Sequence, residues 1–320
     1  MSQPATLADA AALAHDIESR LNQVLIGQQQ VVREVLIALI SGGHVLIEGV
    51  PGLGKTLLVR SLGRVLELDF NRIQFTPDLM PTDVTGHAMY DQKTEQFRIR
   101  RGPAFTQLLL ADEINRASPR TQSALLQAMQ EKTVTVSGQE HKLPEPFHVL
   151  ATQNPIEQEG TYPLPEAQLD RFMMQIDVDY PDLEAERAIV IATTTGKQPE
   201  IKSALSKGEL VSMQSLVRDM PIGESVIDAI LTTVRSLRPG TDAGNDINEY
   251  VTWPPGPRAS QSLMLAVRAR ALLEGRSAPS VDDVKALAEP ILKHRMALNY
   301  QARADGVTVE TLITRVTDTL

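Results

Sequence analysis

The stretch GVPGLGKT, from Gly49 to Thr56, decides the fold of this chain. It fits the phosphate-binding pattern G-x-x-x-x-G-K-[ST] at every fixed position. The apolar run before it, at residues 44–48, predicts a buried strand, and the apolar periodicity after it, at residues 56–68, predicts a helix. A strand, a glycine-rich turn and a helix N-terminus together present backbone N–H groups and partial positive charge to one anion. The sequence therefore predicts that phosphate groups bind here.

The side chains of this loop predict a nucleotide with a metal ion. Lys55 is expected to reach the β- and γ-phosphates, and the hydroxyl of Thr56 to hold Mg²⁺. We also expect Lys55 to be exposed while the loop is empty. A chance glycine turn is the alternative, but both flanks of the loop fit the pattern. The residues assigned to nucleotide binding are Gly49, Val50, Pro51, Gly52, Leu53, Gly54, Lys55, Thr56 and Leu57.

The composition limits the class of protein. A length of 320 residues suggests about two domains. The net charge of −9 argues against a dedicated nucleic-acid binder, which usually carries a basic surface. The absence of cysteine excludes disulfides, thiol catalysis and cysteine-bound metals. No apolar run approaches the ~20 residues of a membrane span, and the first residues lack the basic start of a signal peptide. We therefore expect a cytoplasmic protein with no membrane insertion.

Strand and helix patterns alternate through the first part of the chain, which predicts an α/β fold. Helical patterns separate most of the strands that follow the phosphate loop, and these strands are expected at 70–75, 107–112, 147–152 and 173–178. Such alternation predicts a parallel sheet with helices on both faces. Two segments interrupt it, at 89–100 and 132–143, and both are expected to form hairpins.

The pattern changes at about Asp182, where strand signals vanish. Helices are predicted at 184–194, 210–219, 225–237, 260–274, 281–297 and 309–320. Loops are expected at 196–208 and 253–257. The sequence therefore predicts two domains, an α/β nucleotide-binding core over residues 1–195 and an all-helical domain over residues 205–320.

Two adjacent acids end the strand predicted at 107–112. In an open α/β sheet the carboxyl ends of the strands face the ligand crevice. Asp112 is expected to hold Mg²⁺ through its water shell, and Glu113 to polarise the attacking water as general base. The alternative is that both acids cap the next helix. The phosphate loop favours the catalytic interpretation, because the two signals complement each other.

Three further polar residues fit the same chemistry. Asn154 follows the strand predicted at 147–152 and is expected to hydrogen-bond the γ-phosphate and the attacking water, although an Asn-Pro turn is the alternative. Arg171 is either a surface ion pair or an arginine finger offered to a neighbouring subunit's γ-phosphate. Arg258 starts a predicted helix and is a candidate to reach back to the nucleotide. Spacing alone leaves the alternatives for both arginines open.

Seven motifs carry a resemblance to a known family. In order they are GVPGLGKT, RIQFTPDLMPTDVTG, LLLADEINRA, TQSALLQAMQE, ATQNP, EGTYPLPEAQLDRF and SVDDVKALAEPILKHR. Together, over about residues 20–300, they resemble the MoxR family of AAA+ ATPases. The resemblance implies an AAA+ core with a five-stranded parallel sheet of order 5-1-4-3-2, a helical lid, and a homo-oligomeric ring that is usually hexameric. It also implies that the two hairpins line a central pore.

The resemblance assigns further residues. It implies that Arg171 is the arginine finger, that Arg258 is the second sensor, and that Val24, Ile26 and Gly27 belong to a segment that contacts adenine. The lead-in to Arg258 is PPGPRAS, where relatives commonly have GASPRA. Whether Arg258 acts on the nucleotide of its own subunit or of its neighbour therefore stays open.

The resemblance implies a Mg²⁺-dependent ATPase that converts ATP and water to ADP and phosphate. Members of the family look like chaperones that remodel client proteins with a von Willebrand factor A domain protein, in metal-cofactor insertion or complex maturation. The alternative is a nucleic-acid motor or a chelatase-like ring, against which the acidic composition and the lack of a DNA-binding module weigh. A simple kinase or GTPase does not fit the helical lid or Arg171.

Overall fold

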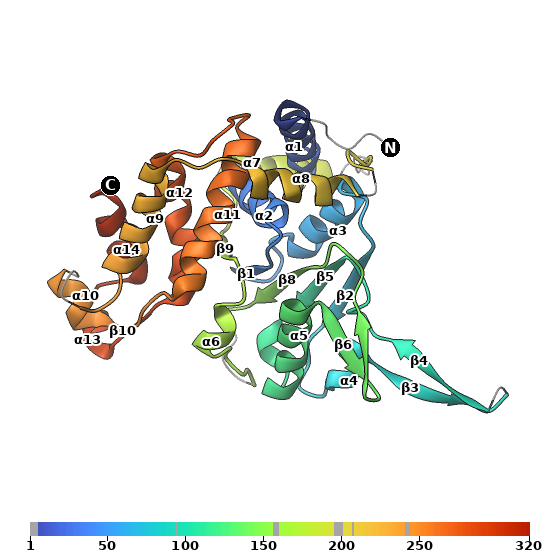
Figure 1. Cartoon of the computed structure of the whole chain (residues 1–320). Coiled ribbons are helices and arrows are strands. Elements are labelled where there is room, and N and C mark those ends of the chain that lie inside the picture. Colours follow the sequence, from blue (N-terminus) through green and yellow to red (C-terminus); the bar gives the residue numbers. More distant parts are fainter. Residues whose placement is uncertain (1–5, 94, 156–159, 195–200, 207, 241–243) are drawn as a thin grey trace.

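The structure is a computed structural model that describes residues 6–93, 95–155, 160–194, 201–206, 208–240 and 244–320. Figure 1 shows a sheet-containing part, coloured blue to green, beside a helical part coloured orange to red. No helix in these described ranges combines the length and apolar character needed to cross a membrane.

Five parallel strands form the central sheet, in the order β2-β5-β8-β1-β9. Counted along the chain these are strands 2-3-4-1-5, so the predicted order is confirmed. Residues of the inner strands are almost all buried, as apolar runs in a sheet covered on both faces should be. The strands are β1 (Val45–Gly49), β2 (Phe70–Gln74), β5 (Leu108–Asp112), β8 (His148–Gln153) and β9 (Met174–Val178).

The two faces of the sheet belong to two hydrophobic cores. Val45 and Ile47 of β1 belong to a core shared with residues 10–40 and with the helical region from residue 205 onward, here called the lid, whereas Leu46 belongs to a second core with Leu125 and Leu126. This alternation is the period of two that a strand imposes on its side chains. The helices around the sheet are α1 (Leu7–Asn22), α2 (Gln29–Ile40), α3 (Lys55–Val65), α4 (Pro81–Thr85), α5 (Pro119–Glu131) and α6 (Glu166–Leu169), with a 3₁₀ turn at Ile114–Arg116.

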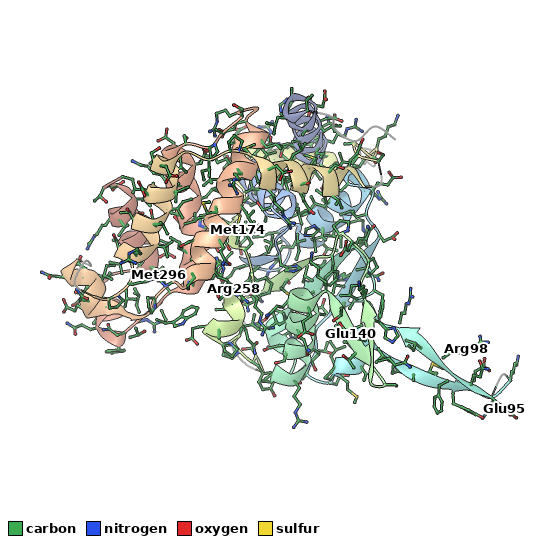
Figure 2. All side chains as sticks on the ribbon, viewed as in Figure 1. Glu95, Arg98, Glu140, Met174, Arg258 and Met296 are labelled. Carbon is green, nitrogen blue, oxygen red and sulfur yellow. The ribbon has the colours of Figure 1, made fainter. Side chains whose placement is uncertain are left out.

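Both predicted hairpins are present. The first pairs β3 (Gly86–Asp91) with β4 (Gln96–Arg101), and the second pairs β6 (Thr133–Val136) with β7 (Gln139–Lys142). Figure 1 shows that β3–β4 projects far from the body of the molecule, and Figure 2 places Arg98 and Glu95 on its outer part.

The C-terminal region is helical, as predicted. Its helices are α7 (Leu183–Thr194), α8 (Glu209–Asp219), α9 (Glu224–Ser236), α10 (Asn245–Tyr250), α11 (Pro257–Leu273), α12 (Val281–Leu292), α13 (Tyr300–Ala304) and α14 (Val309–Thr317). The predicted helix at 281–297 is too long: α12 ends at Leu292, and a 3₁₀ turn at Lys293–Arg295 follows.

A small antiparallel pair corrects the expectation that strands are absent after Asp182. β10 (Val251–Trp253) pairs with β11 (Ala297–Leu298). Such short strands leave no periodicity for a sequence pattern to detect. The loop expected at 196–208 falls partly on residues 196–200 and 207, which lie outside the described residues, so the division into 1–195 and 205–320 stays a prediction.

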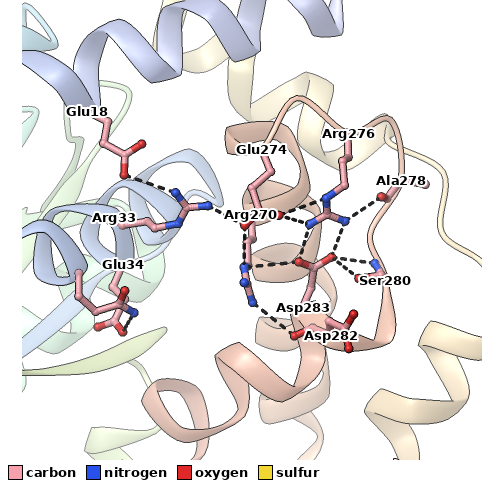
Figure 3. A network of polar contacts seen from close by, with 11 residues as sticks. Glu18, Arg33, Glu34, Arg270, Glu274, Arg276, Ala278, Ser280, Asp282 and Asp283 are labelled. Atoms are coloured by element: carbon pink, nitrogen blue, oxygen red, sulfur yellow. Dashed lines mark hydrogen bonds and ion pairs between the residues drawn. The ribbon is translucent and has the colours of Figure 1, made fainter.

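Polar contacts join the core to the lid on the side shown in Figure 3. Arg33 of α2 contacts Glu18 of α1 at 3.5 Å and Glu274, at the end of α11, at 2.6 Å. Within the lid, Arg276 contacts Glu274 and the buried Asp283, each at 2.6 Å. Asp283 also accepts the backbone N–H of Ser280 at 2.7 Å, which caps α12.

Candidate nucleotide site

The phosphate loop connects β1 to α3 at the carboxyl end of the sheet. Gly52 and Gly54 have φ of 90° and 78°, a left-handed conformation that glycine adopts without steric cost. Gly49 is needed for another reason, since a Cβ there would lie 2.6 Å from the carbonyl oxygen of Val178 on β9. Gly54 is the N-cap of α3, so the N–H groups of the first helical turn are available to an anion.

Lys55 is held by its own loop. Its Nζ donates to the carbonyl oxygens of Gly49 at 2.5 Å and of Gln153 at 3.4 Å. Burial lowers the pKa of Lys55, and the charges of Asp112 and Glu113 oppose that shift. The expectation that Lys55 is exposed is therefore wrong, because the side chain folds back over the loop and is half-buried.

Asp112 is fixed through both of its carboxylate oxygens. Its Oδ1 accepts the hydroxyl of Thr152 at 2.6 Å, and its Oδ2 accepts two N–H groups of Arg72, at 2.7 Å and 3.1 Å. Arg72 lies on β2 and Thr152 on β8, the two strands that flank β5. The carboxylate is thus aimed by side chains from both neighbouring strands.

Glu113 is held next to Asp112 in an unusual backbone conformation. Its φ is 55°, a value uncommon for a residue with a side chain, and its N–H donates to the hydroxyl of Thr152 at 2.8 Å. Its carboxylate accepts hydrogen bonds from the side-chain amide of Gln74 at 2.6 Å and from the guanidinium of Arg116 at 3.1 Å. Thr152 therefore supports both acids, and the turn at Glu113 directs its carboxylate toward the loop.

A pocket of about 280 Å³ brings these groups together. Its walls are Pro51, Gly52, Gly54, Lys55, Thr56, Arg72, Gln74, Asp112, Glu113 and Asn154. The structure thus gathers five of the predicted phosphate-binding residues, both acids and Asn154 around one pocket. Leu57 lies outside this pocket, with 43% of its surface exposed, and Gly49, Val50 and Leu53 belong to the loop without lining the pocket.

Sequence reasoning missed three residues of this site. Arg72 bonds Asp112, Gln74 bonds Glu113, and Thr152 bonds both acids. Arg72 and Gln74 alternate on β2, and polar residues at alternate positions next to an acidic strand end are the signal that could have found them. Thr152 had no such signal, because a single threonine in an apolar strand is ordinary.

The donor set suits Mg²⁺. Thr56 offers a hydroxyl and Asp112 a carboxylate, and both line the pocket. Magnesium prefers oxygen ligands, and proteins usually supply one or two carboxylates beside substrate phosphates. The residues present therefore fit a magnesium nucleotide, and bound Mg²⁺ would neutralise charge on the phosphates.

A second cavity, of about 530 Å³, lies between the start of α2, the end of β9 and α12. Gly27 and Gln28 line it, whereas Val24 and Ile26 do not. Gln28 also donates its amide to the carbonyl oxygen of Leu53 in the phosphate loop at 2.7 Å. The second cavity therefore adjoins the phosphate loop. Of the three residues expected near adenine, the structure brings only Gly27 to this cavity.

Arg171 and Arg258 lie elsewhere: Arg171 follows Asp170 in the sequence, and Arg258 contacts Asp170 from the lid. Neither lines the phosphate pocket. The Nη1 of Arg258 lies 3.7 Å from a carboxylate oxygen of Asp170, and its side chain is 43% exposed. Figure 2 shows Arg258 on the lid side of the junction with the core. Within the described part of the chain, no hydrogen bond or ion pair engages the guanidinium of Arg171.

Comparison with known proteins identifies both parts of the chain. A family model described as "ATPase family associated with various cellular activities (AAA)" matches residues 44–174, and one described as "AAA lid domain" matches residues 246–316. The crystal structure of a candidate ATPase from Cytophaga hutchinsonii superposes with a TM-score of 0.91 at 38% identity, over 97% of this chain and 95% of that one.

Curated relatives extend over almost the whole chain. Chaperone MoxR1 of Mycobacterium tuberculosis is 43% identical over 97% of this chain and 83% of its own length. Protein YeaC of Bacillus subtilis, which is uncharacterized, is 42% identical over 92% of this chain and 90% of its own. Protein MoxR of Paracoccus denitrificans is 31% identical, over 94% of each.

Proposed function

Because the chain belongs to the MoxR family of AAA+ ATPases, we propose that it hydrolyses ATP with Mg²⁺ in a ring of identical subunits and thereby remodels client proteins. The observation that carries this proposal is the single pocket that joins the phosphate loop to Asp112, Glu113 and Asn154. These groups are those that hydrolysis of a phosphoanhydride needs: an anion cradle, metal ligands, a base and a donor for the attacking water.

Each residue has a separate task in this proposal. Lys55 exchanges the carbonyl oxygen of Gly49 for phosphate oxygens, and Thr56 and Asp112 hold the metal ion. Glu113 leaves the amide of Gln74 and takes a proton from the attacking water, which Asn154 orients. The adenosine half occupies the second cavity, where Gly27 and Gln28 form part of the wall.

The two arginines complete the site of a neighbouring subunit. Three facts support this. Both arginines lie outside the phosphate pocket of their own chain. Arg171 follows Asp170 in the sequence and Arg258 contacts the carboxylate of Asp170. The guanidinium of Arg171 has no intramolecular partner among the described residues. We therefore assign Arg258, like Arg171, to the nucleotide of the next subunit. An arginine finger supplied between subunits stabilises the charge of the transition state.

The biological role in this proposal is that of a cytoplasmic chaperone. It rests on the relative named Chaperone MoxR1 and on the family resemblance. A von Willebrand factor A domain protein is the proposed partner, and metal-cofactor insertion or complex maturation the proposed task. Stimulation of ATP turnover by DNA in low salt, where phosphate contacts are strongest, would instead favour a nucleic-acid motor.

Mixing two inactive variants tests the two-subunit site. Lys55→Ala should lose most nucleotide affinity, whereas Arg171→Ala should bind ATP normally and hydrolyse it ~10³-fold more slowly, the scale of a lost arginine finger. In rings that contain both variants, some interfaces pair the intact loop of one with the intact arginine of the other. Part of the steady-state ATPase activity should therefore return on mixing.

Arg64→Ala is the matched control, because Arg64 is exposed on α3 and away from the pocket. It should hydrolyse ATP at the wild-type rate. Native mass spectrometry establishes that each variant assembles and that mixed rings form. Normal turnover by Arg171→Ala would refute the finger, and mixed rings without recovery would refute its action between subunits.

A further inference from the structure

Arg295 is a fully buried arginine that joins the lid to the segment around Arg171. Its side chain is 1% exposed, and it follows α12 in the 3₁₀ turn of the lid. Its Nε donates to the carboxylate of Asp170 at 2.8 Å. Its Nη2 donates to the carbonyl oxygen of Phe172 at 2.6 Å, and its Nη1 to that of Met173 at 3.0 Å. One guanidinium thus contacts three residues of a four-residue segment of the core.

The same side chain is fixed on the lid side. Its Nη2 lies 3.1 Å from the hydroxyl of Ser262 on α11, and its Nη1 donates to the carbonyl oxygen of Ile291 on α12. The preceding residue, His294, is also buried and bonds the carbonyl oxygen of Phe172 through Nε2 at 3.0 Å. Two adjacent lid residues therefore hold the core segment at several points.

Arg171 lies within the segment 170–173 that the lid holds. Phe172, directly after it, is completely buried, and Asp170, directly before it, bonds both Arg295 and Arg258. The residues on both sides of Arg171 are thus immobilised, while its own guanidinium has no partner in the described chain. Arg171 is thus a partly exposed side chain between two residues that the chain holds in place.

Stability alone is a poor explanation for this cluster. Burial lowers the pKa of Arg295 to about 10, with Asp170 opposing the shift, so the guanidinium stays charged at neutral pH. A buried ion pair contributes little net stability compared with apolar packing, because both charges lose their hydration. What a guanidinium adds is a planar fork with donors in fixed directions. That geometry fixes the orientation of a backbone segment.

We propose that Arg295 is a positioning residue, which orients the segment 170–173 on the lid so that Arg171 and Arg258 reach the neighbouring nucleotide as one unit. This inference rests on the proposed function, in which both arginines act between subunits. It has a mechanical consequence: the lid of each subunit sets the placement of the arginines that the next subunit uses. A displacement of about 1 Å in such a group can lower a rate by ~10²-fold.

Pairwise mixing of variants tests the proposal. Arg295→Met should bind ATP normally and lose ~10²-fold in ATPase rate. Mixed with Lys55→Ala, which retains its arginines, it should recover as much activity as Arg171→Ala does in the same mixture. Mixed with Arg171→Ala it should recover nothing, because both partners then lack a working finger. A general folding defect would instead damage the nucleotide pocket of the variant and prevent recovery in both mixtures.

Arg276→Met is the matched control. Arg276 is another lid arginine that bonds a buried carboxylate, that of Asp283 at 2.6 Å, but among the described residues it forms no hydrogen bond or ion pair with the segment 170–173. Its loss should leave the ATPase rate of assembled rings unchanged. Asp170→Asn keeps the side-chain volume while removing the charge that Arg295 and Arg258 share, and it should show the same mixing pattern as Arg295→Met.

The reference mixture of Lys55→Ala with Arg171→Ala separates two kinds of failure. If the reference does not recover, the proposed action between subunits is wrong. If the reference recovers but folded Arg295→Met or Asp170→Asn fails to recover with Lys55→Ala, or recovers with Arg171→Ala, the positioning role is wrong. Where Arg295→Met does not fold, Asp170→Asn gives the same decision.

Discussion

The phosphate pocket and the segment 170–173 are both polar centres, but they are supported differently. In the pocket, Asp112 and Glu113 are held by residues of the core, from strands β2 and β8 and the turn after β5. In the segment, Asp170 is held by Arg295 and Arg258, which both come from the lid. The pocket is therefore a property of the core alone, whereas the placement of Arg171 depends on both parts of the chain.

The charges of the two centres also differ. The pocket contains two carboxylates with Lys55 and Arg72, and its cations already contact groups of the chain. Around Asp170, Arg258 and Arg295 share one carboxylate and Arg171 follows it in the sequence, so positive charge remains at a surface where Arg171 and Arg258 are both at least partly exposed. In the proposed function, this difference suits a pocket that receives a ligand and a segment that completes the site of a neighbouring subunit.

Glu113→Gln should separate the two centres with the largest effect. We expect ATP to bind but its hydrolysis to fall by at least ~10²-fold, the scale of a lost general base. Because the variant keeps the segment 170–173 intact, it should still restore activity to Arg171→Ala in mixed rings. ATP binding by calorimetry and phosphate release in the mixture measure the two properties. Failure to restore Arg171→Ala would mean that the two centres are not independent.

Thr152→Val should have a smaller effect confined to the pocket. It removes the hydroxyl that donates to Asp112 and accepts the N–H of Glu113, and a loss of about 1.4 kcal/mol in transition-state stabilisation lowers the rate tenfold. We expect about a tenfold loss in the rate of ATP hydrolysis. In mixed rings, the variant should restore activity to Arg171→Ala as fully as a chain with an intact pocket does.

Thr233→Val is the control for the loss of a buried hydroxyl. Thr233 is completely buried in the lid, and its hydroxyl donates to the carbonyl oxygen of Ala229. Both threonine variants should lower the melting temperature, but only Thr152→Val should lower the rate. Equal rates of ATP hydrolysis for the two variants would show that the hydroxyl of Thr152 does not help to position the two acids.

Acid should have the smallest effect, and it should act at the amino ends of the strands, opposite the end that carries the phosphate pocket. His44 precedes β1 and His148 begins β8; both are buried, and burial lowers their pKa values to about 3 and about 4. His148 also bonds Gln214 of the lid helix α8 at 3.0 Å. Below pH ~6.5 the unfolded chain binds protons that the folded chain does not. The free energy of unfolding should therefore fall as the pH decreases from ~6.5 toward 4.

Each histidine should contribute about 1 kcal/mol to this loss at pH ~5.5. Urea unfolding at pH 7 and pH 5.5 measures it, and His148→Gln should reduce the difference between the two pH values. His87→Gln, at an exposed position on β3, should not. An unchanged pH difference in His148→Gln would exclude that histidine as a source of acid sensitivity.

Much of the fold could be predicted because its signals are local. The apolar runs that form β1, β5 and β8 are each followed by residues with a predicted role: the phosphate loop, the two acids, and Asn154. A parallel sheet brings the carboxyl ends of its strands together. The phosphate loop, both acids and Asn154 therefore converge in one pocket, as expected. Element boundaries were harder to predict: the apolar residues Met296 and Ala297 extended the predicted helix to 297, whereas α12 ends at Leu292 and a 3₁₀ turn of polar residues follows it.

The residues that could not be predicted act through contacts distant in sequence. Arg72 contacts Asp112 across 40 positions, and Arg295 contacts Asp170 across 125. Nothing near Arg295 in the sequence indicates a buried ion pair, because KHR at the end of a helix normally faces solvent and interacts with the helix dipole. Lys55 was expected to be exposed because the motif indicates only its phosphate partners. It does not indicate the carbonyl oxygens of Gly49 and Gln153, which accept hydrogen bonds from Lys55 when no nucleotide is bound.

Because the hairpin β3–β4 projects from the core, a rotation of the core displaces the tip of the hairpin more than its root. Its root is rigid, because Gly86 and Gly102 are packed so closely that a Cβ would lie 2.3 Å from the carbonyl oxygen of Arg100 and 2.4 Å from that of Val84. Its strands of six residues extend about 20 Å at 3.4 Å per residue. A rotation of the core by about 10° therefore sweeps the tip through about 3.5 Å. The exposed rings of Tyr90 and Phe97 lie on this hairpin, 5.3 Å apart. A small rotation of the core would therefore displace this aromatic surface by several ångströms.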